Sequence, residues 1–172
     1  PLPALKSLDA PQRVIYAGTF SKALFPALRC AWLVVPVKQI AQFRHQASLA
    51  PCAVPVLWQN TLADFLREGH FWRHLKKMRQ HYAQRRQWIE QALTQQGFQV
   101  VPQKGGIQMV IRMIGDDIAH ARKANAAGLA VQALSDWRIR SSGEGGLLLS
   151  FTNIVNEGMA RQVAQQLRKA LS

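Results

Sequence analysis

Cysteine is scarce in this sequence of 172 residues, which contains only Cys30 and Cys52. The two are too far apart for a CxxC pair and both stand among apolar residues, so we expect buried free thiols rather than a disulfide framework or a zinc site. No stretch approaches the roughly 20 uncharged apolar residues of a membrane span, and the first residues lack the basic and then apolar order of a signal peptide. We therefore expect a cytoplasmic protein.

Acidic residues are also few, because 9 Asp and Glu stand against 22 Lys and Arg, a formal net charge of +13. Such a charge attracts nucleic acid or phosphorylated ligands without sequence specificity. The hydrophobic content of 48% fits a folded globular chain with one sizeable core or two small ones. Extensive disorder is therefore excluded.

The first half of the chain alternates between strand and helix patterns. Near-continuous apolar runs in residues 13–20 and 28–36 predict two short buried strands of a sheet that is covered on both faces. Helical spacing follows in residues 37–50 and in residues 56–69. A long amphipathic helix then extends from Phe71 to Gly97, and its lysines and arginines supply much of the net charge.

The second half has a different composition. The patterns predict a pair of strands in residues 98–114, a helix in residues 116–129 opened by Asp116 or Asp117, a strand in residues 145–154 and a closing helix in residues 156–172. This order predicts two units, residues 1–97 and 98–172. We interpret "SSGEGG", residues 141–146, as a flexible turn, because it lacks the lysine and the following helix of a P-loop.

The segment "GTFSKALFPALRCAWLVVP" carries the strongest candidate chemistry. Lys22 follows the end of one predicted strand and lies between apolar segments, where desolvation favours a neutral amine that can attack an aldehyde. Gly18, Thr19 and Ser21 offer backbone N–H groups and hydroxyls, and Arg29 offers a fork of donors, which together suit a phosphate monoester. The residue types alone leave the alternative open that Lys22 is a solvated turn lysine and Arg29 a surface charge.

This segment closely resembles the lysine segment of fold-type I pyridoxal-phosphate proteins, in the form found in aminotransferase-like effector domains of MocR-type regulators of the GntR family. The resemblance continues in collinear order through "FLREGHFWRHLKKMRQHYAQRRQ", "GGIQMVIRM", "AGLAVQALSDW" and "GGLLLSFTNI". It implies an α/β fold in which residues 1–97 form the C-terminal part of the large domain, with a mixed, mostly parallel sheet and a long connecting helix. Residues 98–172 would form a small α+β domain.

The resemblance also implies roles for individual residues. Lys22 matches the lysine that forms the internal aldimine with pyridoxal 5'-phosphate. Thr19 and Ser21 match positions that help hold the cofactor phosphate, and Arg29 matches the arginine that pairs with it. The resemblance therefore predicts Lys22 as the catalytic residue and all four residues as the cofactor-binding set.

Two departures from the family pattern bear on activity. Amino-acid aminotransferases usually carry an arginine on the late strand that binds the substrate α-carboxylate, and the matching position here is Leu148, with Arg138 and Arg140 as the candidates for a replacement. The family's aspartate for the pyridinium nitrogen, its ring-stacking aromatic residue and its glycine-rich phosphate turn all lie well upstream of the lysine. With 21 residues before Lys22, we expect the C-terminal part of a longer protein with an incomplete cofactor site.

The predicted function is effector sensing in a transcriptional regulator, with an amino compound or the cofactor itself as effector. The resemblance implies a homodimer and DNA binding only through an N-terminal winged helix that this sequence lacks. Two alternatives stay open: a fragment of a pyridoxal-phosphate-dependent class I or II aminotransferase acting on an amino acid, and a cofactor-free structural remnant.

Histidine and tryptophan suggest two further sites that we do not expect. His70, His74 and His81 lie on roughly one side of the long helix, but Arg73 beside them would repel a metal ion and no glutamate stands between the first two. We therefore expect no metal site. The five tryptophans lie on predicted apolar faces, which favours core or subunit-interface positions over base stacking: Trp32, Trp58, Trp72, Trp88 and Trp137.

Overall fold

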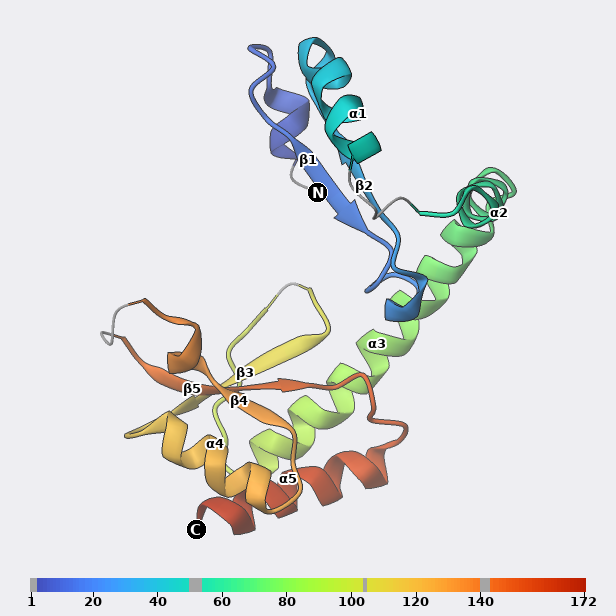
Figure 1. Cartoon of the computed structure of the whole chain (residues 1–172). Coiled ribbons are helices and arrows are strands. Elements are labelled where there is room, and N and C mark those ends of the chain that lie inside the picture. Colours follow the sequence, from blue (N-terminus) through green and yellow to red (C-terminus); the bar gives the residue numbers. More distant parts are fainter. Residues whose placement is uncertain (1–2, 50–53, 104, 140–142) are drawn as a thin grey trace. The chain divides into compact units, whose positions relative to one another are not determined.

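The computed structural model describes residues 3–49, 54–103, 105–139 and 143–172. The chain divides into two compact units, Pro1–Leu75 and Lys76–Ser172, whose elements are labelled in Figure 1. The long helix α3, His70–Gln95, begins in the first unit and continues into the second. The predicted division of the family's domains at residue 97 stays a prediction.

The sheet of the first unit is an antiparallel strand pair. Its strands are β1, Tyr16–Thr19, and β2, Ala31–Val34. The ring of Trp32 on β2 lies against Tyr16, with ring centroids 4.9 Å apart. The same indole covers Gly18 so closely that a Cβ at this position would lie 2.2 Å from it. Only glycine fits here, because any side chain would displace Trp32.

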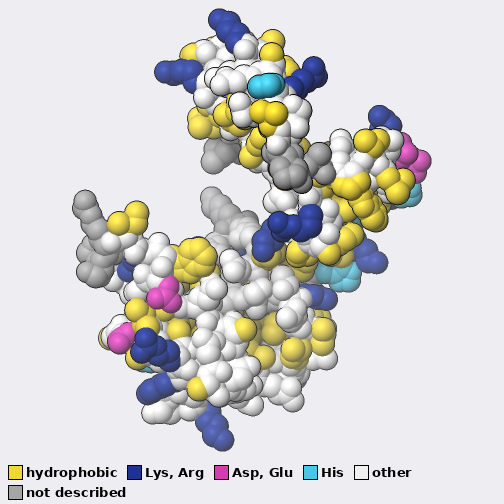
Figure 2. Space-filling model, viewed as in Figure 1, with side chains coloured by type: hydrophobic (Ala, Val, Ile, Leu, Met, Phe, Trp, Pro, Cys, Tyr) yellow, Lys and Arg dark blue, Asp and Glu magenta, His cyan; other side chains and the backbone are white. Residues whose placement is uncertain are grey.

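The expectation that both strands are buried is wrong for this unit. The two strands run antiparallel, and Ile15, Tyr16, Leu33 and Val34 are all exposed. Strand side chains become buried only when another layer packs on the sheet, and the unit's helices α1 and α2 have no buried residue among those described. The hydrophobic side chains on the surface of this unit are visible in Figure 2.

The helices of the first unit form where the spacing predicts them. α1, Ile40–Leu49, follows a short 3-10 turn, and α2, Val56–Arg67, ends two residues before Gly69. α3 ends at Gln95, two residues before Gly97. The predicted helical segments 37–50, 56–69 and 71–97 are therefore confirmed within the described residues, with ends that differ by a few residues.

The second unit has a three-stranded sheet with helices on one face. The strands β3, Gln108–Met113, β4, Val131–Ala133, and β5, Gly145–Ser150, form an antiparallel sheet in the order β3-β5-β4. α4, Asp117–Ala126, and α5, Glu157–Leu171, lie along one side of this sheet in Figure 1. The arrangement is a two-layer α/β unit, and it agrees with the predicted small α+β domain in its element types.

The core of the second unit lies between the sheet and the helices. Alternate residues of β3 and β5 point into it and are buried: Met109, Ile111, Leu147 and Leu149. α3, α4 and α5 contribute buried residues of their own: Ile89, Ala92, Leu93, Ala121, Ala124, Ala160, Ala164 and Leu167. Because strand side chains alternate between faces, the remaining positions of β3 and β5 lie on the opposite, outer face.

Three elements differ from the sequence expectations. β4 is absent from the predictions, because three residues are too few for a recognisable alternation. β5 ends at Ser150, and the predicted continuation forms a turn that buries Phe151 and Ile154. Of the predicted pair in residues 98–114 only β3 is a strand, and the segment before it makes one bridge, between Val100 and Ile111.

The cap of α4 confirms one prediction and corrects its alternative. The side chain of Asp116 accepts hydrogen bonds from the backbone N–H groups of Ile118 and Ala119, so Asp116 is the cap. Asp117 is buried instead, and 2% of its surface is exposed. A carboxylate can be buried in this way only when hydrogen bonds replace its water.

The tryptophans are less buried than predicted. Trp58, Trp72 and Trp137 are exposed, with between 51% and 67% of their surface accessible, whereas Trp32 and Trp88 are half-buried. These three tryptophans therefore do not lie in the core of this chain, and the alternative of a subunit-interface position stays a prediction. Cys30 is buried, as expected, and Cys52 lies outside the described residues. In the described ranges, no helix has the length and apolar character to cross a bilayer.

Candidate functional site

The candidate site is the connection between β1 and β2. Thr19 is the last residue of β1 and lies opposite Ala31, the first residue of β2. The strand pair therefore brings the two ends of the connection together, and the backbone N–H of Phe20 donates to the Cys30 carbonyl at 3.1 Å. Residues ten positions apart in sequence, Thr19 and Arg29, are in this way held at the same end of the sheet.

The hydroxyls of Thr19 and Ser21 form a polar cluster at this end. Thr19 Oγ1 lies 3.0 Å from Ser21 Oγ and 3.3 Å from the Cys30 carbonyl oxygen, and it accepts a hydrogen bond from the Ser21 N–H at 3.2 Å. Both hydroxyls can turn to donate to an incoming oxygen anion, because a hydroxyl rotates to suit its partner. The structure therefore brings together the two hydroxyls that the sequence predicts.

Lys22 lies in the middle of a tight turn after β1. The Leu24 N–H donates to the Phe20 carbonyl at 2.7 Å and closes this turn around Lys22. The side chain of Lys22 is exposed, while Phe20 at the base of the turn is buried. The desolvated setting that the sequence suggests for this amine is therefore not formed by the described residues.

Arg29 stands directly before β2 in an unusual backbone conformation. Its φ of 47° and ψ of 34° fall in the left-handed region, and its N–H donates to the Pro26 carbonyl at 3.2 Å. Few residues other than glycine adopt this conformation without a specific local reason. Arg29 adopts it as the C-cap of the 3-10 turn Pro26–Leu28, and its side chain is exposed.

Two contacts fix the turn to the start of α3. The ring of buried Phe20 packs edge-on against Phe71, with centroids 5.7 Å apart. His74 Nε2 lies 2.8 Å from the Ala23 carbonyl oxygen and acts as donor there. The sequence did not predict this role for His74, and the only signal was that it shares roughly one side of the helix with His70 and His81. A turn held at both Phe20 and Ala23 keeps Lys22 in a defined place.

His70, on the same helix, also has hydrogen-bond partners. His70 Nε2 lies 3.0 Å from a Glu68 carboxylate oxygen, and His70 Nδ1 lies 2.9 Å from an Arg73 guanidinium nitrogen. Over the described ranges, no group of three or more His, Cys, Asp or Glu side chains is placed to hold a metal ion.

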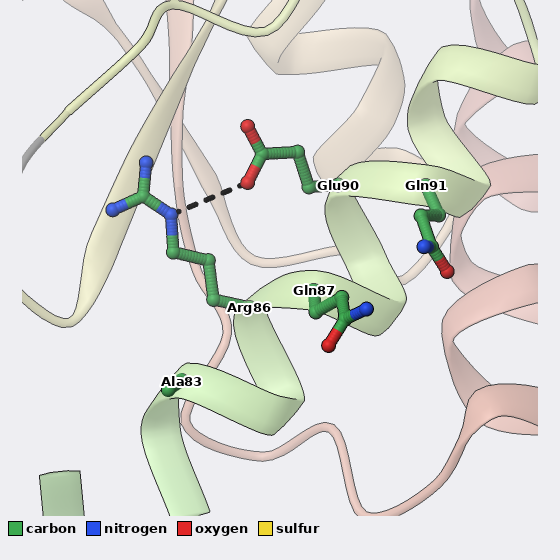
Figure 3. A pocket seen from close by; sticks show the side chains of 5 residues that line it. All are labelled: Ala83, Arg86, Gln87, Glu90 and Gln91. Carbon is green, nitrogen blue, oxygen red and sulfur yellow. Dashed lines mark hydrogen bonds and ion pairs between the residues drawn. The ribbon is translucent and has the colours of Figure 1, made fainter. Parts of the chain in front are cut away.

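A depression on α3 is a weaker candidate. It has a volume of about 330 Å³ and all five side chains that line it come from one helix, as Figure 3 shows: Ala83, Arg86, Gln87, Glu90 and Gln91. Arg86 Nε lies 3.3 Å from a Glu90 carboxylate oxygen, so the two charges neutralise each other. A depression with one wall and no free charge offers little to a ligand.

Leu148, which stands where the resemblance expects a carboxylate-binding arginine, lies on β5. Leu148 pairs with Val110 of β3 and is half-buried on the outer face of the sheet. Of the two candidate replacements for an arginine there, Arg140 lies outside the described residues. Arg138 is half-buried, and its guanidinium donates to the Glu144 carbonyl.

Asp117 organises the segments around this strand. Its carboxylate accepts hydrogen bonds from the Gly146 N–H at 2.8 Å and from the Ser135 N–H at 3.2 Å. Burial alone would raise the pKa of Asp117, but these hydrogen bonds and the nearby charge of Arg138 lower it below its usual 3.8. The carboxylate is therefore ionised at neutral pH and joins α4 to β5.

Comparison with known proteins identifies the family. The sequence profile described as "Aminotransferase class I and II" matches residues 3–144. The chain belongs to this aminotransferase family. A solved member of the fold, the alpha-aminoadipate aminotransferase LysN from Thermus thermophilus, superimposes with a TM-score of 0.82 at 26% identity, over 99% of this chain and 45% of that one. The predicted fold-type I aminotransferase class is thus confirmed.

Several curated relatives of this chain are named as regulators. The "Probable rhizopine catabolism regulatory protein MocR" of Rhizobium meliloti is 35% identical over 99% of this chain, and the "HTH-type pyridoxine biosynthesis transcriptional regulator PdxR" of Corynebacterium glutamicum is 28% identical over 100%. The chain spans 35% and 38% of the lengths of these two relatives. The predicted resemblance to MocR-type regulators is confirmed, and the roles of Lys22, Thr19, Ser21 and Arg29 stay predictions.

Proposed function

We propose that this chain is part of the effector-sensing domain of a MocR-type transcriptional regulator of the GntR family, and that Lys22 binds pyridoxal 5'-phosphate. The observation that carries the proposal is the Lys22 turn within a family whose curated relatives here are named as regulators. The solved aminotransferase complexed with N-(5'-phosphopyridoxyl)-L-leucine supports the choice of cofactor.

The residues of the turn suit this ligand by their chemistry. Lys22 would hold the cofactor at its aldehyde carbon, because a neutral amine is a nucleophile toward an aldehyde. The hydroxyls of Thr19 and Ser21 would donate to phosphate oxygens from the end of β1, and the exposed guanidinium of Arg29 would form charge-assisted hydrogen bonds with the same group from the start of β2. When bound, the cofactor supplies an electron sink for chemistry at an amino compound.

Leu148 favours sensing over turnover. A leucine cannot pair with a substrate carboxylate, and the resemblance places an arginine at this position in amino-acid aminotransferases. An amino compound that displaces Lys22 from the cofactor would free the lysine and change the contacts of the turn with α3. A contact that is made in one conformation of a domain and not in another shifts the equilibrium between the two.

The partners follow from the regulator assignment. We propose a homodimer, DNA contact through a winged helix outside these 172 residues, and a small amino compound or the cofactor itself as effector. A cytoplasmic location belongs to the same proposal, because a regulator of this class acts on chromosomal DNA.

The phosphate-binding part is tested by comparing pyridoxal 5'-phosphate with pyridoxal, which lacks the phosphate. We expect the 172-residue chain to prefer the phosphorylated form by roughly tenfold or more, because charge-assisted hydrogen bonds to phosphate are strong. Arg29→Gln should remove most of this preference, as measured by visible absorbance titration. The control, Arg44→Gln, removes the same charge from an exposed position on α1. An equal loss in both variants would assign the preference to net charge and refute the role of Arg29.

An aminotransferase is the second candidate, favoured by the family match and by the likeness to LysN. The two functions differ in steady turnover. We expect the full-length protein to show a cofactor-dependent response to an amino compound in its DNA binding and no sustained transamination of common amino acids. Sustained transamination at enzyme-like rates of about 1 s⁻¹ or more would contradict the sensor proposal and support the enzyme.

A further inference from the structure

The outer face of the sheet in the second unit carries a pocket that the proposed function does not use. It has a volume of about 220 Å³. Val101, Val110 and Leu134 supply apolar lining, and Arg112, Arg138 and Glu144 supply charge. Two guanidinium groups against one carboxylate leave a net positive charge, which suits a small anion with an apolar body.

The positions of the charged groups follow from the strand register. Arg112 on β3 pairs with Gly146 on β5, and Val110 pairs with Leu148, so Arg112 and Val110 share the outer face. Gly146 is covered by its neighbours, since a Cβ there would lie 3.1 Å from the Val110 side chain and 3.4 Å from the Leu134 side chain. Arg138 approaches from the segment after β4, where Leu134 also lies. The pocket therefore combines an apolar floor with guanidinium groups from two elements.

Glu144 already contacts both Arg112 and Arg138. Its carboxylate forms an ion pair with Arg112, and its backbone carbonyl accepts a hydrogen bond from Arg138. An ion pair between side chains that are 44% and 72% exposed is weak, because water screens both charges. The Glu144 carboxylate is thus a replaceable occupant, and it shows that this place accepts a carboxylate.

Arg138 has a further donor to offer. Its Nη1 atom is buried and has no hydrogen-bond partner among the residues the structure describes. Gly143 lies so close that a Cβ there would be 2.6 Å from this atom, and a larger residue would push the guanidinium away. A buried cationic donor without an acceptor is costly, and a ligand oxygen that accepts from it removes that cost.

We propose that this pocket binds a small organic monocarboxylate, with Arg138 and Arg112 holding the carboxylate and Val101, Val110 and Leu134 contacting the apolar body. Glu144 competes for Arg112, and the ligand displaces its side chain. The inference is independent of the cofactor proposal, because no residue of the Lys22 turn takes part. The protein would thus take a second class of ligand, and Glu144 would regulate access to the pocket.

The test is a titration of the 172-residue chain with 3-methylbutanoate, followed by ¹H–¹⁵N chemical-shift changes, with the neutral 3-methylbutanamide as matched probe. We expect saturable shifts in β3, β5 and the segment 134–139 with the acid and none with the amide. Arg138→Gln should weaken binding by about tenfold or more, since charge-assisted hydrogen bonds are lost. Arg122→Gln, which removes the same charge from an exposed position on α4, should leave it unchanged.

Glu144→Gln gives a prediction of opposite sign, which holds even if Arg138→Gln fails to fold. Removing the internal competitor should tighten 3-methylbutanoate binding by about twofold to fivefold. The proposal is overturned if Glu144→Gln weakens binding, if the amide binds as well as the acid, if Arg122→Gln loses as much affinity as Arg138→Gln, or if no saturable shifts occur with the acid.

Discussion

Lys22→Ala should abolish the borohydride-stable adduct that pyridoxal 5'-phosphate forms at the turn after β1. After reduction with borohydride and peptide mapping, the wild-type chain should carry the adduct on Lys22 in preference to its other lysines. The physical reason is that Lys22 directly follows Ser21, whose hydroxyl lies 3.0 Å from that of Thr19, while Arg29 stands before β2 at the same end of the strand pair. Phosphate binding by these three side chains would raise the local concentration of the aldehyde. The visible absorption band of the bound cofactor should vanish with the adduct.

The matched control is Lys38→Ala, which removes an exposed lysine from the same unit. We expect it to keep both the band and the Lys22 adduct. A third variant, Lys22→Arg, retains the charge but not the nucleophilic amine, and it should behave like Lys22→Ala. An adduct spread evenly over surface lysines in the wild-type chain would contradict the cofactor proposal for these 172 residues and would support the structural-remnant alternative.

Asp117→Ala should lower the free energy of unfolding of the second unit by about 2–4 kcal/mol. The substitution leaves the backbone N–H groups of Gly146 and Ser135 without their acceptor in a buried place, and it removes a negative charge near Arg138. The change in unfolding free energy is measured by urea unfolding, with hydrogen exchange of the β3 and β5 amides as the probe of the second unit. Asp136→Ala, at an exposed position nearby, serves as the control and should have little effect.

The same carboxylate predicts a pH dependence. Its pKa is lowered in the folded chain, so the ionised form contributes stability above the ordinary value of 3.8, and this contribution is lost as the pH falls through the lower, folded pKa. The difference in unfolding free energy between the wild-type chain and Asp117→Asn should therefore be largest near neutral pH and should shrink below about pH 4. A difference that stays constant down to pH 2 would show that the charge of Asp117 does not stabilise the fold.

Local signals in the sequence determined most of the helices. Sequence patterns predicted α1, α2, α3, α4 and α5. They also predicted a cap for α4 at Asp116 or Asp117, because a cap and the N–H groups it binds are three or fewer residues apart, and the structure shows that it is Asp116. The motif around Lys22 likewise indicated the family, because its residues are close together in the chain and form one recognisable pattern. These features depend on interactions between near neighbours, which a sequence pattern records directly.

Interactions between distant residues were decided only by the tertiary structure. The apolar runs of β1 and β2 predicted strands, but their antiparallel pairing and their exposed faces depend on which layers pack against them. The contact of His74 with Ala23 spans 51 positions, and Asp117 reaches Gly146 across 29. No local pattern encodes such partners, because burial and hydrogen bonding at these sites arise from the packing of separate elements. The sequence alone therefore determined the helices and the family of this protein, and the packing of its strands and loops decided which charged groups meet.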